Sequence, residues 1–311
     1  MSFAFVFPGQ GSQALGMADQ LLADFPAARA RFEQASEILG YDIEKLISEG
    51  PVEKLNRTEV TQPALMVVSV AVWDQWLANN GAEPAFMAGH SFGEYSALVC
   101  SGAMSYEDGI AIVQYRGRFM QEAAPEDGGA VAAILGLEPE QLIDICAQVA
   151  DQEVVQCANF NAPGQIAIAG HSAAVARAGE AAKEAGAKKV IPLKVSAPVH
   201  TEIMRPAAER LREKLAAVDI TTPRVAVLHN VDVQARQDAD SIRQALYDQM
   251  FSPVLWADTV NSFAAEGVST VVECGAGKVL SGLVKRTNRA LETLQICDKQ
   301  SIENALATCG G

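Results

Sequence analysis

The sequence lacks several features that would place it in a specialised class. None of its six cysteines forms a C-x-x-C pair, so neither a zinc site nor a disulfide set is indicated, and we expect free thiols in a reducing cytoplasm. No apolar run reaches the roughly 18 residues that a membrane helix needs. The first expected strand begins almost at Met1 and leaves no room for a signal peptide. We therefore expect a cytoplasmic protein with no membrane partner and no metal site.

Positive charge is also scarce. The 311 residues include 24 Lys and Arg against 38 Asp and Glu, and the net charge of −14 argues against nucleic acid as a partner. A local basic patch can still attract an acidic partner at short range. Three stretches are dense in cations, although each is also typical of a solvated helix face. They are Lys188 and Lys189 with Lys194, the segment carrying Arg205, Arg210, Arg212 and Lys214, and Lys285 and Arg286 with Arg289.

The order of the expected elements predicts an α/β fold in two subdomains. Residues 1–127 and 198–311 form a large α/β-hydrolase-like subdomain around a mostly parallel sheet. Residues 128–197 follow the order β-α-β-β-α-β and predict a small inserted ferredoxin-like subdomain, with a hinge at residues 125–129. The expected strands are 3–7, 85–88, 130–135, 154–158, 165–169, 188–193, 225–228 and 268–272, and the longer helices are 61–79, 105–124, 139–150, 173–185, 200–215 and 242–250.

The stretch from Gly89 to Gly93 carries the clearest chemical signal. It reads Gly-His-Ser-Phe-Gly, with a short apolar strand before it and helical apolar spacing from Glu94 onward. In this strand–turn–helix context the serine lies at the tip of a sharp turn, next to unpaired N–H groups at the helix N-terminus. These groups stabilise the oxyanion that a nucleophilic serine generates. Ser91 is the expected nucleophile, and the alternative is an ordinary serine in a glycine-rich turn.

A nucleophilic serine needs a base, and the chain has four histidines. His90 adjoins the serine and points away from it, His171 follows a strand of the small subdomain, and His229 ends an isolated strand. His200 is the best candidate, because we expect it to open a helix at the carboxyl edge of a sheet, downstream of Ser91. No Asp or Glu between Ser91 and His200 follows a strand of the main sheet, which separates this chain from an ordinary esterase.

Arg116 is a candidate site residue because of its place on the helix expected at 105–124. It lies three or four positions from Ile112, Val113, Phe119 and Met120, so it projects from the apolar face of its helix. A guanidinium directed into a core needs an anion, because burying an unpaired charge is costly. That anion is either a protein carboxylate or a carboxylate that arrives with the substrate.

Two glycine-rich turns raise the question of a phosphate site. Residues 8–13 lack the lysine and the second-glycine spacing of a P-loop, and the third glycine of a dinucleotide fingerprint. They predict instead a flexible loop at a strand's carboxyl end, where open α/β sheets bind their ligands. Residues 275–278 are typical of a tight turn from strand to helix.

These residues, in this order, resemble the malonyl-CoA:acyl carrier protein transacylase family, which belongs to the acyltransferases of fatty acid and polyketide synthesis. The resemblance covers essentially the whole chain. Its marks are residues 7–13 (FPGQGSQ), 61–64 (TQPA), 89–97 (GHSFGEYSA), 115–117 (YRG), 159–165 (NFNAPGQ), 198–200 (PVH) and 248–253 (DQMFSP). The resemblance implies a ping-pong transfer, in which Ser91 takes malonyl from malonyl-CoA and the phosphopantetheine thiol of acyl carrier protein takes it from Ser91.

The same resemblance implies roles for further residues and no cofactor or metal. His200 is the base, the backbone carbonyl of Gln249 orients it, and Arg116 holds the malonyl carboxylate. Backbone N–H groups of Gln10 and Phe92 bind the oxyanion, and Gln62, Asn159 and Asn161 line the substrate site. Phe92 is bulkier than the expected leucine, and Val199 stands where acyl size is often selected, so both bear on malonyl selectivity. The resemblance also implies a monomer.

Two other functions stay open at this point. One is a serine hydrolase or thioesterase, for which water is the acceptor, and the other is a carrier-docking module with a vestigial site. The sequence does not identify the carrier protein, nor does it separate fatty acid synthesis from another acyl pathway.

Overall fold

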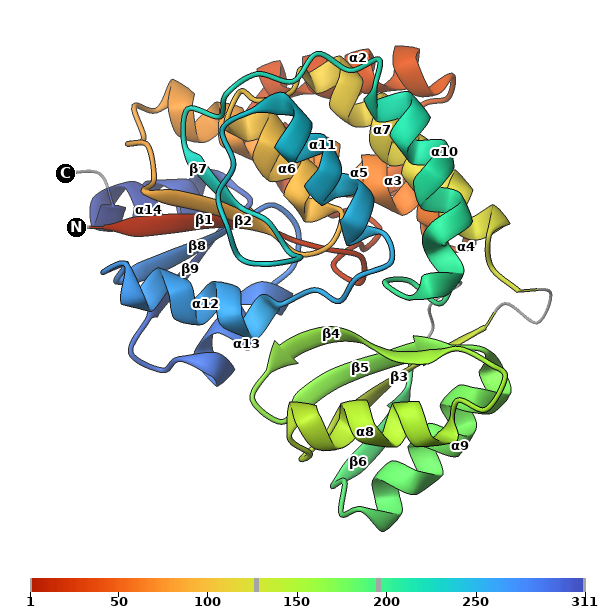
Figure 1. Cartoon of the computed structure of the whole chain (residues 1–311). Helices are drawn as coiled ribbons and strands as arrows, with labels where there is room; N and C mark the ends of the chain where they lie inside the picture. The colour runs from red at the N-terminus through yellow and green to blue at the C-terminus, as the bar shows by residue number, and fades with distance from the viewer. Residues whose placement is uncertain (1, 126–128, 194–196, 310–311) are drawn as a thin grey trace.

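The computed structural model describes residues 2–125, 129–193 and 197–309, so residues 126–128 of the predicted hinge and Lys194 of the first basic stretch lie outside the described residues. The chain folds into two parts, a large one with helices on both faces of a sheet and a small one that carries its own sheet and two helices (Figure 1). The predicted boundaries of the two subdomains remain a proposal.

The large part is built on a five-stranded parallel sheet in the order β7-β2-β1-β8-β9. Its strands are β1 (Phe3–Phe7), β2 (Phe86–Gly89), β7 (Ala226–Leu228), β8 (Thr270–Cys274) and β9 (Glu292–Ile296). The predicted parallel sheet is confirmed, although β9 was not predicted. The sequence suggested that the strand before His229 is isolated, and this is wrong. That strand is β7, which pairs with β2 and forms an edge of the sheet. The chain reverses its direction of winding between β1 and β8, which is where such sheets bind ligands.

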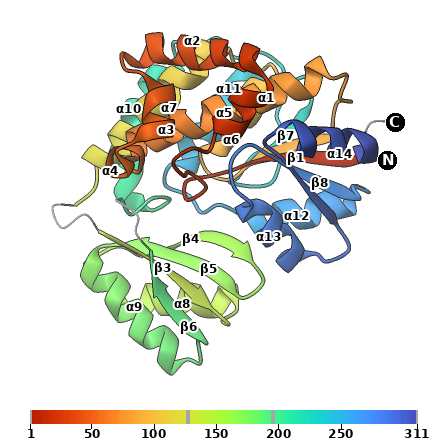
Figure 2. The ribbon, with the colours of Figure 1, turned by 180° about the vertical axis from the view of Figure 1, so that it is seen from behind.

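Side chains of β1 alternate between the two cores of the large part. Phe3, Phe5 and Phe7 belong to the larger core, with buried residues of the helices at 29–39, 58–78, 93–100, 106–122, 205–215 and 239–249. Ala4 and Val6 face the other way and belong to a smaller core with residues of the helices at 256–265 and 279–287. This alternation is the two-residue period of a strand, and it places helices on both faces of the sheet (Figure 2).

Three helices predicted for the large part, at 61–79, 105–124 and 242–250, agree with the structure to within three residues. The described residues of the large part form twelve α-helices. They are α1 (Asp19–Asp24), α2 (Arg29–Leu39), α3 (Ile43–Glu49), α4 (Val52–Leu55), α5 (Thr58–Ala78), α6 (Gly93–Cys100), α7 (Tyr106–Glu122), α10 (Arg205–Leu215), α11 (Ala239–Gln249), α12 (Trp256–Ala265), α13 (Val279–Thr287) and α14 (Lys299–Cys309). The helices α12 and α14 were not predicted. The helix predicted for 200–215 begins later than expected, with a short 3-10 turn at Glu202–Met204 before α10.

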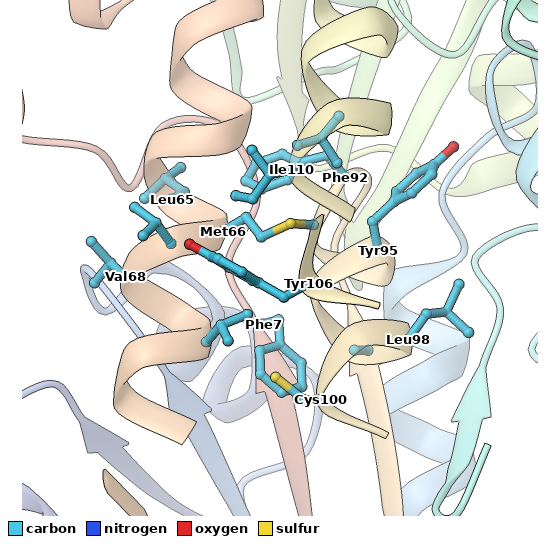
Figure 3. Close-up of a cluster of buried hydrophobic side chains, with 14 of the residues drawn as sticks. Phe7, Leu65, Met66, Val68, Phe92, Tyr95, Leu98, Cys100, Tyr106 and Ile110 are labelled. Atoms are coloured by element: carbon cyan, nitrogen blue, oxygen red, sulfur yellow. The ribbon is translucent and has the colours of Figure 1, made fainter. Parts of the chain in front are cut away.

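Helix α5 is the centre of the larger core. Sixteen of its residues are buried, so it is apolar on nearly all sides rather than amphipathic. Figure 3 shows its side chains packed against those of β1, the Ser91 turn, α6 and α7; the labelled residues are Phe7, Leu65, Met66, Val68, Phe92, Tyr95, Leu98, Cys100, Tyr106 and Ile110. Because α6 and α7 both pack on α5, the positions of Ser91 and Arg116 are fixed by the same core.

The small part confirms the predicted β-α-β-β-α-β order. It contains β3 (Ala130–Leu135), α8 (Pro139–Val149), β4 (Val155–Ala162), β5 (Gln165–Gly170), α9 (Ser172–Glu184) and β6 (Lys189–Pro192), with an antiparallel sheet in the order β4-β5-β3-β6. Both helices cover one face of this sheet, and the other face is turned toward the large part (Figure 1). Two backbone hydrogen bonds join β4 to the segment before α12, Phe160 N to Val254 O and Val254 N to Ala158 O, each 2.9 Å.

Candidate active site

The turn between β2 and α6 is tight enough to require its two glycines. A Cβ on Gly89 would lie 1.8 Å from the carbonyl carbon of Gly93, and a Cβ on Gly93 would lie 2.4 Å from the carbonyl oxygen of Phe7. Ser91, at the tip, has a φ of +55°, a left-handed conformation that is strained for a residue with a side chain. The sequence therefore folds into the sharp turn predicted from its glycine spacing, and this turn exposes the serine hydroxyl.

Ser91, His200 and Gln249 form a chain of hydrogen bonds. The Oγ of Ser91 lies 2.7 Å from Nε2 of His200, and Nδ1 of His200 lies 2.8 Å from the backbone oxygen of Gln249. A carbonyl oxygen can only accept, so Nδ1 carries the proton and Nε2 is free to accept one from Ser91. His200 does not open a helix as predicted. It has a φ of +59° and lies before the 3-10 turn, in an irregular segment that directs its ring at the serine.

Burial makes His200 neutral at physiological pH. Only 1% of its surface is exposed, and desolvation lowers the pKa of its imidazole from 6.5 to about 3, with the nearby Arg116 charge acting in the same direction. The neutral ring is the form that can act as a general base.

Arg116 is buried in the same site, and 1% of its surface is exposed. Its Nη1 donates to Oε1 of Gln62 at 3.1 Å, while its Nη2 donates to Oγ of Ser91 at 3.1 Å and to Oε1 of Gln249 at 2.9 Å. Burial lowers the pKa of the guanidinium. Across the described residues, every hydrogen-bond acceptor of Arg116 is neutral. The side chain therefore projects inward as its spacing predicted, and it contacts no protein carboxylate directly.

A second layer of polar residues supports the turn, and the sequence did not predict it. Asn230 accepts from Ser91 N through Oδ1 and donates to Gly89 O through Nδ2, both at 2.7 Å. Glu94 accepts from Asn230 N at 2.8 Å and from Nε2 of Gln249 at 2.9 Å. Two features of the sequence could have pointed to this layer. They are the carboxylate of Glu94 in the mostly apolar helix α6, and the polar residues His229 and Asn230 at the carboxyl end of β7.

A cavity of about 560 Å³ opens between the two parts at this point. Its lining includes Gln10, Gln62, Ser91, Phe92, Arg116, Asn159, Asn161, Val199 and His200 from the predicted site, together with Leu193, Val279, Leu280 and Leu283. Within the described residues, neither the Gln10 N–H nor the Phe92 N–H donates to another residue. Gln10 and Phe92 both line the cavity with Ser91, and binding of an oxyanion by their N–H groups stays a prediction.

The remaining predicted residues occupy different places in the site. Oδ1 of Asn161 lies 2.8 Å from Nε2 of His90, so this ring nitrogen of His90 has Asn161 as its partner. Asn159 is 9% exposed and lies on β4 at the cavity wall. His171 accepts from Val154 N at 2.9 Å and is structural. In the three described segments there is no cluster of His, Cys, Asp and Glu that could hold a metal ion.

A comparison with known families agrees with this geometry. The sequence matches the acyl transferase domain over residues 4–305. A malonyl CoA-acyl carrier protein transacylase of Salmonella typhimurium is 48% identical over 304 residues, which cover 98% of this chain and 98% of that protein. The chain belongs to the malonyl-CoA:acyl carrier protein transacylase family.

Other members of the family are similarly close. The enzyme of the same name from Bacillus subtilis is 47% identical over 306 residues, covering 98% of this chain and 96% of that one. The structure of the family member from Coxiella burnetii has a TM-score of 0.98 at 44% identity and covers 100% of this chain and 98% of that chain. A structure of a type II PKS acyl-carrier protein in complex with its malonyl-transacylase has a TM-score of 0.97 at 46% identity. The match covers 99% of this chain and 100% of that chain.

Membership of the family makes the chain an acyltransferase with an α/β fold, as the sequence predicted. All six cysteines are free thiols in the structure. Within the described residues, no helix is both long and apolar enough to cross a bilayer.

Proposed function

We propose that the chain transfers a malonyl group from malonyl-CoA to the phosphopantetheine thiol of acyl carrier protein. The observation that carries this proposal is the placement of three groups around one cavity. Ser91 Oγ lies 2.7 Å from His200, His200 is held by a neutral carbonyl, and Arg116 is buried with no contacting carboxylate among the described residues. Nucleophile, base and a cation able to bind the malonyl carboxylate are thus within reach of one small acyl group.

In the first half-reaction, Ser91 Oγ attacks the thioester carbonyl while His200 Nε2 takes the serine proton. A C–O bond forms, and the negative charge that develops on the carbonyl oxygen is bound by the N–H groups of Gln10 and Phe92. The C–S bond then breaks, and His200 returns its proton to the departing coenzyme A sulfur. The product is a malonyl-Ser91 ester and free coenzyme A.

In the second half-reaction the same steps run in reverse with the carrier thiol. His200 removes the thiol proton, the sulfur attacks the ester, and the serine leaves with the proton that His200 returns. Thioester and ester are close in free energy, so the reaction needs little driving force and depends chiefly on excluding water from the ester. Apolar residues of the cavity lining, among them Leu193, Val279, Leu280 and Leu283, serve this exclusion.

The electrostatics of the site suit a substrate that carries a carboxylate. A bidentate pair between Arg116 and the malonyl carboxylate would satisfy the buried guanidinium. It would also offset the charge that lowers the pKa of His200, which makes His200 a stronger base once the substrate is bound. A neutral carbonyl behind His200, in place of the usual acid, avoids a second anion beside that carboxylate.

The remaining parts of the proposal concern the setting of the reaction. We propose that the two substrates are sufficient without a cofactor or metal, that the protein acts in the cytoplasm as a monomer, and that it supplies extension units for fatty acid synthesis. The free cysteines agree with a reducing compartment. Selectivity for malonyl would depend on Phe92 and Val199, which both line the cavity.

Incubation with malonyl-CoA, with and without acyl carrier protein, tests the proposal. Transfer predicts malonyl-carrier only when the carrier is present, with slow loss of malonyl-CoA in its absence. Rapid release of malonate without the carrier would identify a thioesterase. Binding of the carrier with neither transfer nor hydrolysis would identify a docking module, and either result would contradict the proposal.

A further inference from the structure

The charge of Arg116 has an indirect partner in the free protein. Gln249 lies between Arg116 and Glu94, with Oε1 2.9 Å from Arg116 Nη2 and Nε2 2.9 Å from Glu94 Oε2. The orientation of this amide is fixed by its neighbours, because a guanidinium can only donate and a carboxylate and the Ser91 carbonyl can only accept. A cation and an anion are therefore linked through one side-chain amide.

Glu94 is surrounded by nitrogen atoms of its neighbours. It is fully buried, and its two oxygens face three nitrogen atoms: Nδ1 of His229 at 2.7 Å, Asn230 N at 2.8 Å and Nε2 of Gln249. The N–H groups of Asn230 and Gln249 match the acceptor oxygens of a carboxylate. The charge of Glu94 also acts against the desolvation that lowers the pKa of Arg116.

We propose that Glu94 is a buried counter-charge to Arg116, relayed by the side chain of Gln249, that sets how strongly the site prefers acyl groups bearing a carboxylate. Glu94 touches no reacting atom in this arrangement, so it is a specificity-determining and positioning residue. Its negative charge weakens the hold of Arg116 on an incoming carboxylate. This moderation suits an enzyme that must release the malonyl group to a second acceptor, because tight binding of the resting substrate does not speed its transfer.

The variant Glu94→Gln tests the proposal, which rests on the proposed malonyl transfer. The amide keeps the size of the side chain and can still accept from Asn230 and Gln249, but it removes the charge. We measure kcat/KM for malonyl-CoA and for acetyl-CoA, which lacks the carboxylate. The ratio of the two constants should rise on the order of tenfold, chiefly through a lower KM for malonyl-CoA, because an uncompensated Arg116 attracts an anion more strongly.

Glu273→Gln is the matched control. Glu273 is also fully buried, but its carboxylate caps α13 by accepting from Leu280 N at 3.1 Å and Ser281 N at 2.8 Å, away from Arg116. Loss of its charge is expected to lower stability and to leave the malonyl-to-acetyl ratio unchanged. A rise in the ratio for both variants would mean that any buried glutamate has this effect and would overturn the proposal.

A double-mutant cycle with Arg116→Ala separates a charge effect from a structural one. If Glu94 acts through Arg116, Glu94→Gln should leave the ratio unchanged when Arg116 is absent. An equal rise in both backgrounds would overturn the proposal. An unchanged ratio in the single variant Glu94→Gln, which is the result expected if His229 carried a balancing proton, would also overturn it. Parallel losses for both acyl groups, with a lowered melting temperature, would do the same.

If Glu94→Gln does not fold, Gln249→Met replaces it. This variant keeps both charges and the backbone carbonyl at position 249 but removes the amide that links them, so the ratio should again rise. A ratio that stays at the wild-type value would overturn the relay. The wild-type measurement keeps the two proposals apart, because a protein that transfers no malonyl at all contradicts the proposed function and not only the role of Glu94.

Discussion

At the scale of single residues, the chemistry of this site depends on which charges are buried and what they contact. Arg116 and His200 are almost entirely inaccessible, yet only one of them is charged. Burial favours the neutral form of an imidazole, whereas a guanidinium stays protonated even when burial lowers its pKa. The site therefore presents a neutral base beside a fixed cation.

Replacing Arg116 by alanine should lower transfer of the charged malonyl group much more than transfer of the uncharged acetyl group. Truncating one partner of a buried charge pair costs on the order of 2–5 kcal/mol, which corresponds to a loss of roughly 30- to several-thousand-fold in kcat/KM for malonyl-CoA. Transfer of acetyl should fall little or rise. Arg116→Lys should stay impaired, because an ammonium lacks the two-pronged geometry. Parallel losses for both acyl groups, with a lower melting temperature, would make Arg116 structural.

The buried imidazole also predicts how stability changes with pH. The folded protein keeps His200 unprotonated down to about pH 3, whereas the unfolded chain takes up a proton near pH 6.5, so stability is lost as the pH falls between these values. Urea unfolding at about pH 7 and about pH 5 should show a loss that is ~2 kcal/mol larger for the wild type than for His200→Gln. Equal pH dependence in the two proteins would contradict the assignment.

At the scale of elements, the site is held by short turns. In these turns the neighbouring backbone or a left-handed φ favours glycine over residues with a side chain. The turn after β2 brings the backbone of Gly93 against Phe7 of the neighbouring strand, and the turn after β8 uses Gly275 and Gly277 at φ values of +124° and +85°. Such patterns are local in sequence, so the Ser91 turn, the parallel sheet and the β-α-β-β-α-β unit could all be predicted. The short 3-10 turn after His200 could not be predicted, because the left-handed φ of this histidine leaves no periodic pattern in the sequence.

Substituting Gly93 tests the need for close approach at this turn. Gly93→Ala places a Cβ 2.4 Å from a backbone oxygen that cannot move without disturbing β1, so we expect a loss of about 1–3 kcal/mol or more and a strong fall in Ser91 acylation. Gly282→Ala is the control: it lies in α13 with nothing within 4 Å of the added carbon, and should raise stability by up to ~1 kcal/mol. Denaturant unfolding and single-turnover acylation measure both. Normal acylation in Gly93→Ala would contradict the account.

At the scale of the whole molecule, the site is assembled from residues far apart in the chain. Gln249 contacts Glu94 across 155 positions, and Asn230 contacts Gly89 across 141. No spacing rule relates such residues, so the sequence alone could not predict the polar layer behind Ser91. It could predict Ser91 and Arg116, because each stands in a local pattern that exposes or buries it, whereas His200 was chosen by comparison among the four histidines.

Exposed cations on both parts of the protein bear on docking of the carrier. Arg205, Arg210 and Arg212 each pair with a nearby glutamate, whereas Lys188 and Lys189 are exposed and, within the described residues, form no ion pair. Charge reversal at both lysines should raise the KM for acyl carrier protein by roughly 3- to 10-fold and spare that for coenzyme A. The same change at Lys285 and Arg286 serves as the control, and an equal effect at both places would exclude a specific dock.

In the proposed transfer the malonyl group passes through an ester on Ser91. Intact-mass measurement after brief mixing with malonyl-CoA, in the absence of carrier, detects this ester. The wild-type protein should gain one malonyl group, lose it again when acyl carrier protein is added, and yield an equal amount of malonyl-carrier, while Ser91→Ala should gain none. A malonyl adduct that persists in Ser91→Ala, or transfer to the carrier without any adduct on the wild-type protein, would contradict the account.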